Sequence, residues 1–162
     1  MYFLYNFGKN VKKKKKTFRG ATNLHIFLSG LEARAGGYHV HLLPIKSGED
    51  ACSNENIMGH FNPYAVNVSL SPSPGNGTVD QYEIGDISGK FGYLTDQYQL
   101  QKHVMDSNLP LSGPNSIIGR SLVIHYRNGS SNNCNQALLI TGNESFTSLW
   151  RELVPLFFTE LF

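Results

Sequence analysis

SIIGRSLVIHYRNG, residues 116–129, is a short apolar run that ends at a turn containing Asn and Gly. Runs of this kind, bounded by Gly, Pro, Asn and Ser, are typical of β-strands. The same pattern recurs on both sides of it, in residues 21–31, 36–43, 64–77, 82–94 and 135–142. Several short strands at this spacing predict an all-β domain, either a sandwich or a barrel.

The composition agrees with one folded domain. The chain has 162 residues, of which 40% are apolar and 16% are charged, so it is too apolar and too weakly charged for a disordered chain. A membrane helix needs about 20 consecutive apolar residues, and no run approaches that length. We therefore expect no membrane span.

The charge is distributed unevenly. Six lysines lie within residues 9–16, so residues 17–162 hold 8 basic and 12 acidic side chains, a net charge of −4. A folded surface that binds nucleic acid is therefore not expected. We interpret 1–16 as a basic disordered tail, with a polybasic patch for anionic membranes or heparin as the alternative. The predicted domain spans 17–142. Residues 143–162, which are aromatic-rich and contain Pro155, form a separate C-terminal tail.

Cysteine usage and glycosylation sequons both bear on the compartment. Cys52 and Cys134 are too few for a Cys-based zinc site, and they form either one long-range disulfide or two unrelated thiols. Four N-x-[ST] sequons begin at Asn67, Asn76, Asn128 and Asn143. Together these features favour a secreted, oxidising location.

Four of the six histidines stand where they could form one site. His39 and His41 are two residues apart in a predicted strand, so their side chains share a face of the sheet. His60 follows Gly59, and His125 ends the run quoted above. Four imidazoles without a thiolate make a nitrogen-rich site, which suits Cu(II) and also zinc.

The motifs, taken in order, resemble a known family. GGYHVH, Cys52, GHFNP, GDISGKFG, LPLSGPNSIIGRSLVIH and a final Cys are similar to the copper/zinc superoxide dismutase domain from about residue 23 to about residue 142. The resemblance implies a Greek-key β-sandwich or barrel. It also implies copper-dependent dismutation of superoxide to oxygen and hydrogen peroxide.

The resemblance assigns roles to individual residues. It implies that one copper ion per chain is held by four ligands, His39, His41, His60 and His125. His60 is implied to be the catalytic ligand, whose bond to copper is made and broken during the cycle. Cys52 and Cys134 match the disulfide of the family, and Arg120 matches a structural arginine. The other two histidines near strands, His25 and His103, match no ligand position.

The zinc half of the family pattern is missing. No histidine lies between His60 and His103, and Glu83 and Asp86 stand where the last zinc His and the zinc Asp would be. Since a structural zinc takes four ligands, zinc is not expected. The pattern resembles the copper-only branch, including the extracellular dismutase-repeat proteins of animals. There, the resemblance implies, Glu83 and Asp86 accept hydrogen bonds from ligand imidazoles, with Glu83 serving His60. The alternative is that both lie in an exposed turn.

Two departures leave other functions open. Ser131 stands where the family has an arginine that guides superoxide, and only eight residues separate His125 from Cys134, so the charged loop of the family is absent. Weaker attraction of the anion is the expected result. The alternative function is therefore a secreted copper-binding or repeat-scaffold domain with weak or no dismutase activity. A metal-free adhesion module is a third interpretation.

A further departure concerns the first strands. The resemblance implies two strands ahead of residues 21–31, where only 1–16 stands. The first hairpin is then missing, and either MYFLYNF supplies a substitute strand or an uncovered sheet edge favours self-association or contact with neighbouring repeats. We expect the chain to be incomplete at the N-terminus or to be part of a longer protein.

Overall fold

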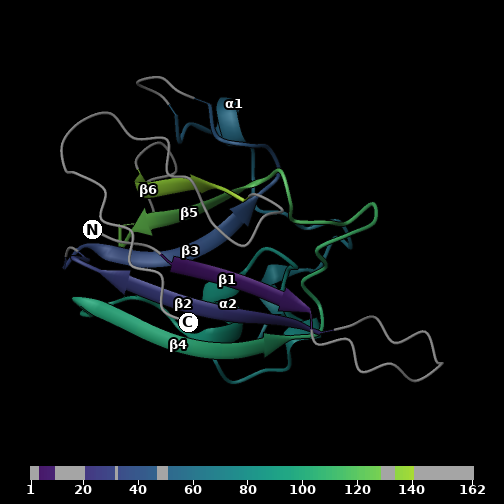
Figure 1. Cartoon of the computed structure of the whole chain (residues 1–162), viewed down its shortest axis with the longest axis horizontal. Coiled ribbons are helices and arrows are strands. Elements are labelled where there is room, and N and C mark those ends of the chain that lie inside the picture. Colours follow the sequence, from purple (N-terminus) through teal and green to yellow (C-terminus); the bar gives the residue numbers. More distant parts are fainter. Residues whose placement is uncertain (1–3, 10–20, 32, 47–50, 129–133, 141–162) are drawn as a thin grey trace, which may run out of the picture.

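The structure of the chain is a computed structural model (Figure 1). It describes residues 4–9, 21–31, 33–46, 51–128 and 134–140.

Two antiparallel sheets of three strands form two layers (Figure 1). One sheet has the order β1 (Leu4–Lys9), β2 (Thr22–Ser29), β4 (Gln99–Asp106). The other has the order β3 (Ala35–His41), β5 (Ser121–Tyr126), β6 (Cys134–Leu139). The chain changes sheet between β2 and β3, returns between β3 and β4, and changes again between β4 and β5, so strands adjacent in the sheets are not all adjacent in sequence. The prediction of an all-β sandwich is confirmed.

The core lies between the two sheets. In β2, Leu24, Ile26 and Leu28 are buried, whereas His25 and Phe27 between them are exposed. The facing sheet contributes buried apolar side chains of β3 and β5, namely Tyr38, Val40, Leu122 and Ile124. The alternation in β2 is the period-2 pattern that a half-buried strand requires.

Two predicted strands are wrong. Residues 64–77 contain only the 3-10 turn Val68–Leu70 (η1), and 82–94 contain the short helix α2, Ile87–Phe91. Asp86 caps α2 by accepting a hydrogen bond from the Gly89 amide at 2.6 Å, which favours a helical turn there. Asn67 accepts from the Ser69 amide in the same way. Two further helical segments, α1 (Asn54–Ile57) and η2 (Val79–Gln81), lie in the long connection between β3 and β4.

The N-terminal segment also departs from the prediction. Leu4–Lys9 form β1, which pairs antiparallel with β2 from Leu4 opposite Phe27 to Lys9 opposite Thr22. The disordered-tail prediction is therefore wrong for these six residues. Of the two alternatives, a substitute strand is what the structure shows. Residues 10–16 and the predicted tail 143–162 lie outside the described residues.

The described segments contain no helix with the length and apolar character needed to cross a bilayer.

Candidate metal centre

The four candidate histidines meet on the outer face of the β3–β5–β6 sheet. Tyr38 and Val40 of β3 face the core, so His39 and His41 lie on the other side of the strand. His125 stands on the same outer face of β5, next to Ile124, whose side chain is in the core. An antiparallel bridge between His41 and His60 completes the group, and Phe61 N donates to Val40 O at 2.8 Å beside it.

Three of the four rings, those of His39, His60 and His125, present nitrogen atoms close enough to share one ion. Ring centroids lie 3.9 Å apart for His39 and His60 and 5.9 Å apart for His60 and His125. One nitrogen from each of His39, His60 and His125 lies within 4.8 Å of the others. His25 and His103 lie on β2 and β4, in the other sheet. The structure thus separates the two groups of histidines as the resemblance implied.

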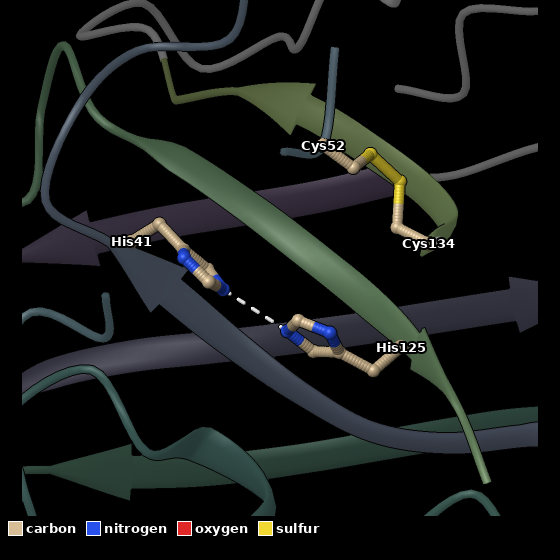
Figure 2. The surroundings of a disulfide bond; sticks show 4 residues. All are labelled: His41, Cys52, His125 and Cys134. Atoms are coloured by element: carbon tan, nitrogen blue, oxygen red, sulfur yellow. Dashed lines mark hydrogen bonds between the residues drawn. A yellow bond between two sulfur atoms is a disulfide. The ribbon is translucent and has the colours of Figure 1, made fainter. Parts of the chain in front are cut away.

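His41 and His125 point toward one another from β3 and β5 (Figure 2), with their Nε2 atoms 3.0 Å apart. The Nδ1 of His41 lies 2.6 Å from the Met58 carbonyl oxygen. Because a carbonyl only accepts, Nδ1 carries the proton and Nε2 presents its lone pair to the cluster. This backbone contact therefore selects the tautomer of His41 that can bind a metal through Nε2.

His39 is oriented by a chain of two hydrogen bonds. Its Nε2 lies 2.9 Å from Ser88 Oγ, and Ser88 Oγ donates to Asp86 Oδ1 at 3.2 Å. Since the Ser88 proton is used on Asp86, Ser88 Oγ accepts the Nε2 proton of His39. The Nδ1 of His39 is buried and has no hydrogen-bond partner among the described residues. Gly37 leaves room for this ring, because a Cβ there would lie 2.6 Å from His39 Cε1.

His60 contacts the carboxylate of Glu83. Its Nδ1 lies 2.9 Å from Glu83 Oε2, and the Glu83 side chain is only 9% exposed. Glu83 and Asp86 are thus in contact with His60 and His39, and neither lies in an exposed turn. Glu83 is placed by the backbone around it, because Gly85 N donates to Phe61 O at 2.9 Å and Gly85 O accepts from Val40 N at 2.8 Å.

Burial keeps three of the imidazoles, those of His39, His41 and His125, neutral. It lowers the pKa of His41 to about 4, against a smaller opposite effect of the Met58 carbonyl. Burial, and then repulsion from the other three rings, lowers the pKa of His125 to about 3. Burial also lowers the pKa of His39, although the contact with Asp86 opposes it. Neutral imidazole is the form that binds metals, so these three rings are ready to act as ligands at neutral pH.

The disulfide joins the His60 loop to the sheet. Cys52 and Cys134 are bonded, with their Cα atoms 5.9 Å apart (Figure 2). Cys134 is the β6 residue opposite His125 on β5. The link therefore connects the segment that leads to His60 with the strand beside His125.

Arg120 has the structural role that the resemblance implied. Its Nε donates to Ser116 O at 2.9 Å, and a second guanidinium nitrogen donates to Leu42 O. The guanidinium carbon also lies 3.7 Å from the centre of the Phe61 ring. Arg120 thus holds together the chain just after His41 and the chain just after His60.

The nitrogen atoms of the site fit a bound metal ion. Four imidazoles converge, and the Nε2 atoms of His41 and His125 approach to 3.0 Å. The orphaned Nδ1 of His39 is a buried polar atom that a metal bond would satisfy. A donor set made only of imidazole nitrogen suits copper or zinc.

Three residues at the site were not predicted from the sequence, and one of them is Met58, whose carbonyl contacts His41. Ser88 relays the hydrogen bond from His39 to Asp86. Arg127 lines the open cavity of about 540 Å³ onto which His39, His41, His60 and His125 face. Its position two residues after His125 is a signal that was present, since i and i+2 share a face of a strand. The predicted Ser131 lies outside the described residues.

Fold and site together define a class: a two-sheet β protein with a cluster of four imidazoles on the outside of one sheet. Residues 8–145 match the family of copper/zinc superoxide dismutases, and the chain belongs to that family. It is 31% identical over 124 residues to the cell surface Cu-only superoxide dismutase 5 of Candida albicans, covering 75% of this chain and 50% of the relative.

Other relatives agree on the family and the fold. The chain is 30% identical over 106 residues to the Cu-Zn superoxide dismutase 2 of Brassica juncea, covering 65% of this chain and 62% of that protein. It therefore spans about half to two thirds of the length of these relatives. The solved Cu(II) form of Candida albicans superoxide dismutase 5 superposes with a TM-score of 0.59 at 24% identity, over 88% of this chain and 94% of that one.

Proposed function

We propose that this protein is a copper-only superoxide dismutase. The observation that carries the proposal is the hydrogen bonding of three imidazoles. One ring nitrogen of each lies on an acceptor outside the cluster, so the other nitrogen is the one that a metal would take. The acceptors are the Met58 carbonyl for His41, Ser88 for His39 and Glu83 for His60. Family membership and the similarity to a Cu-only relative support the same activity.

The four imidazoles, His39, His41, His60 and His125, would hold the copper. When bound there, copper supplies a redox-active ion, and dismutation converts two superoxide ions and two protons into oxygen and hydrogen peroxide. His60 is suited to a proton-carrying role because its side chain is 35% exposed, against 12% for His39. Glu83 accepts the Nδ1 proton and keeps the ring oriented. The Nε2 of His60 can then bind the metal or hold a proton for the product without the ring turning away.

Zinc is not part of the proposed centre. The Nδ1 of His60 is occupied by Glu83, and no second histidine follows before His103. After loading with both metals and washing with a weak chelator, we expect about one copper and no stoichiometric zinc per chain, measured by elemental analysis. One tightly held zinc would contradict the copper-only assignment.

Glu83→Gln is expected to leave copper bound but to weaken it and slow turnover. The change removes the charge that orients His60 while it keeps the size of the side chain, and losses of this kind are about 10–100-fold in affinity or activity. Copper affinity by chelator competition and dismutation rate would be compared with Glu55→Gln, which removes an exposed acid on α1. Equal values for Glu83→Gln and the parent protein would mean that Glu83 does not organise the site.

Arg127 is expected to attract superoxide in place of the arginine that the sequence lacks at Ser131. It lines the cavity, and its only described charge partner is the exposed Asp96, 3.1 Å away. Arg127→Gln should lower the second-order rate constant by up to about tenfold at low ionic strength, and by less as salt screens the charge. Asp96→Asn should raise the rate constant, since it removes the opposing charge. Identical salt dependence in both variants and the parent would refute this role.

The alternative is a secreted copper-binding or scaffold domain with weak or no activity. The missing arginine at Ser131 favours it. A dismutation assay on the copper-loaded protein distinguishes the two functions, because a scaffold would bind copper without turnover.

We also propose an extracellular location, supported by the cell-surface relative and by the exposed sequon residues Asn67, Asn76 and Asn128. Mass analysis of secreted protein before and after glycan removal would test the glycosylation.

A further inference from the structure

His25 and His103 are direct neighbours on the sheet that does not carry the metal centre. They are register partners on the antiparallel strands β2 and β4. Their ring centroids are 4.1 Å apart, and the rings are tilted by 41°. This distance falls within the range of 3.9–5.9 Å found among the rings of the metal centre.

Both imidazoles lie on the solvent side of this sheet. The pairs on either side in the register, Leu24 with Val104 and Ile26 with Lys102, alternate with them toward the core. His25 and His103 are both exposed, as are their outward neighbours Phe27 and Gln101. Within the part of the chain whose side chains are described, neither ring has a hydrogen-bond or ion-pair partner. Both side chains are thus exposed and lie outside the core.

We propose that His25 and His103 form a second metal site, which binds a divalent transition-metal ion such as Zn²⁺ or Cu²⁺ through two imidazoles. Water would fill the remaining coordination positions. Imidazole nitrogen is a preferred donor for these ions, with Cu²⁺ bound more tightly than Zn²⁺. The pair is held by two hydrogen-bonded strands, so little backbone freedom is lost when the ion binds.

Two protein ligands make a weaker site than four. The second site is therefore expected to release its ion to a weak chelator, whereas the centre on the other sheet retains copper. The inference is independent of the proposed function, because it involves neither the four central imidazoles nor turnover.

The test uses Zn²⁺ as the probe on the full, untagged chain, with the central site first filled by one equivalent of Cu²⁺. Zn²⁺ does not displace Cu²⁺ from nitrogen ligands, so calorimetric titration counts only additional sites. The parent protein should bind one Zn²⁺ per chain. Loss of either imidazole should weaken that binding by about 100-fold, because two linked ligands gain that much over one.

His25→Gln and His103→Gln are the test variants, and Gln101→Ala is the matched control on the same strand and face. The control should bind Zn²⁺ like the parent, and all three variants should retain the central copper, which shows that they are folded. A parent protein that binds no Zn²⁺ would overturn the proposal. So would His25→Gln and His103→Gln variants that bind it as tightly as the parent, since the ion would then occupy another site, such as the carboxylates Glu83 and Asp86.

Discussion

His125→Ala is expected to abolish tight copper binding, and His41→Ala is expected to do the same. Each change removes one of four nitrogen donors, from a pair whose Nε2 atoms lie 3.0 Å apart. The three remaining imidazoles would leave a position open to water and to chelators. Copper content after a weak chelator wash should fall from about one equivalent to near zero, and the Cu(II) electron paramagnetic resonance spectrum of four nitrogen ligands should disappear.

His103→Ala is the matched control, since it removes an imidazole from the other sheet. It should retain the chelator-resistant copper. If His103→Ala lost this copper as fully as His125→Ala, the assignment of the centre would be wrong.

Lys90→Met is expected to lower the free energy of unfolding by about 3–5 kcal/mol, the loss typical of a buried ion pair from which one partner is removed. Lys90 Nζ donates to Asp106 Oδ2 at 2.8 Å and to Ile84 O at 2.9 Å, and both charged side chains are 0% exposed. Burial lowers the pKa of Lys90, whereas the attraction of Asp106 raises it. Without Lys90, the Asp106 carboxylate would remain buried with no cation to neutralise it.

The effect can be separated from a general sensitivity of the protein to loss of lysine. Lys46→Met removes an exposed lysine and should change stability by less than about 0.5 kcal/mol. The double variant Lys90→Met with Asp106→Leu should recover most of the loss, because no unpaired charge stays buried. Urea unfolding measures all three, with copper absent. A loss below about 1 kcal/mol for Lys90→Met would mean that water or another group compensates Asp106.

The same ion pair bears on the metal centre. Lys90 holds the carbonyl of Ile84, which directly follows Glu83 in the chain. Asp106 is at the end of β4, so the pair ties the segment carrying Glu83 to the opposite sheet. A contact through the core thus holds the residue next to Glu83, the carboxylate that contacts His60.

The sequence by itself determined the fold class, and it predicted the four imidazoles that the structure brings together. Alternation in β2 and the His39–His41 spacing act within one strand, where period 2 assigns each side chain to a face. The motif resemblance added the likeness to one family, including the Cys52–Cys134 disulfide, which the structure contains. These features could be predicted because they depend on neighbours in sequence or on motifs as a whole.

Only the tertiary structure decided β4, α2 and β1. The inward face of β4 carries Lys102 and Asp106, and a charged side chain on that face hides the apolar alternation that marks a strand. Asp106 is stable there because Lys90, 16 residues earlier, neutralises it. Likewise, Asp86 turns an apolar run into a helix by capping it, and β1 is a strand because the edge of β2 offers it a partner.

Tertiary contacts also decided which residues orient the four predicted ligands. Ser88 and the Met58 carbonyl select tautomers through contacts 49 and 17 residues away in sequence, and neither residue type is itself a signal of metal chemistry. A hydroxyl or a carbonyl becomes part of a metal centre only when folding brings it within hydrogen-bond distance of a ring nitrogen. Sequence pattern could therefore name the four imidazoles, whereas the protonation and direction of each ring were decided by the packed loops around them.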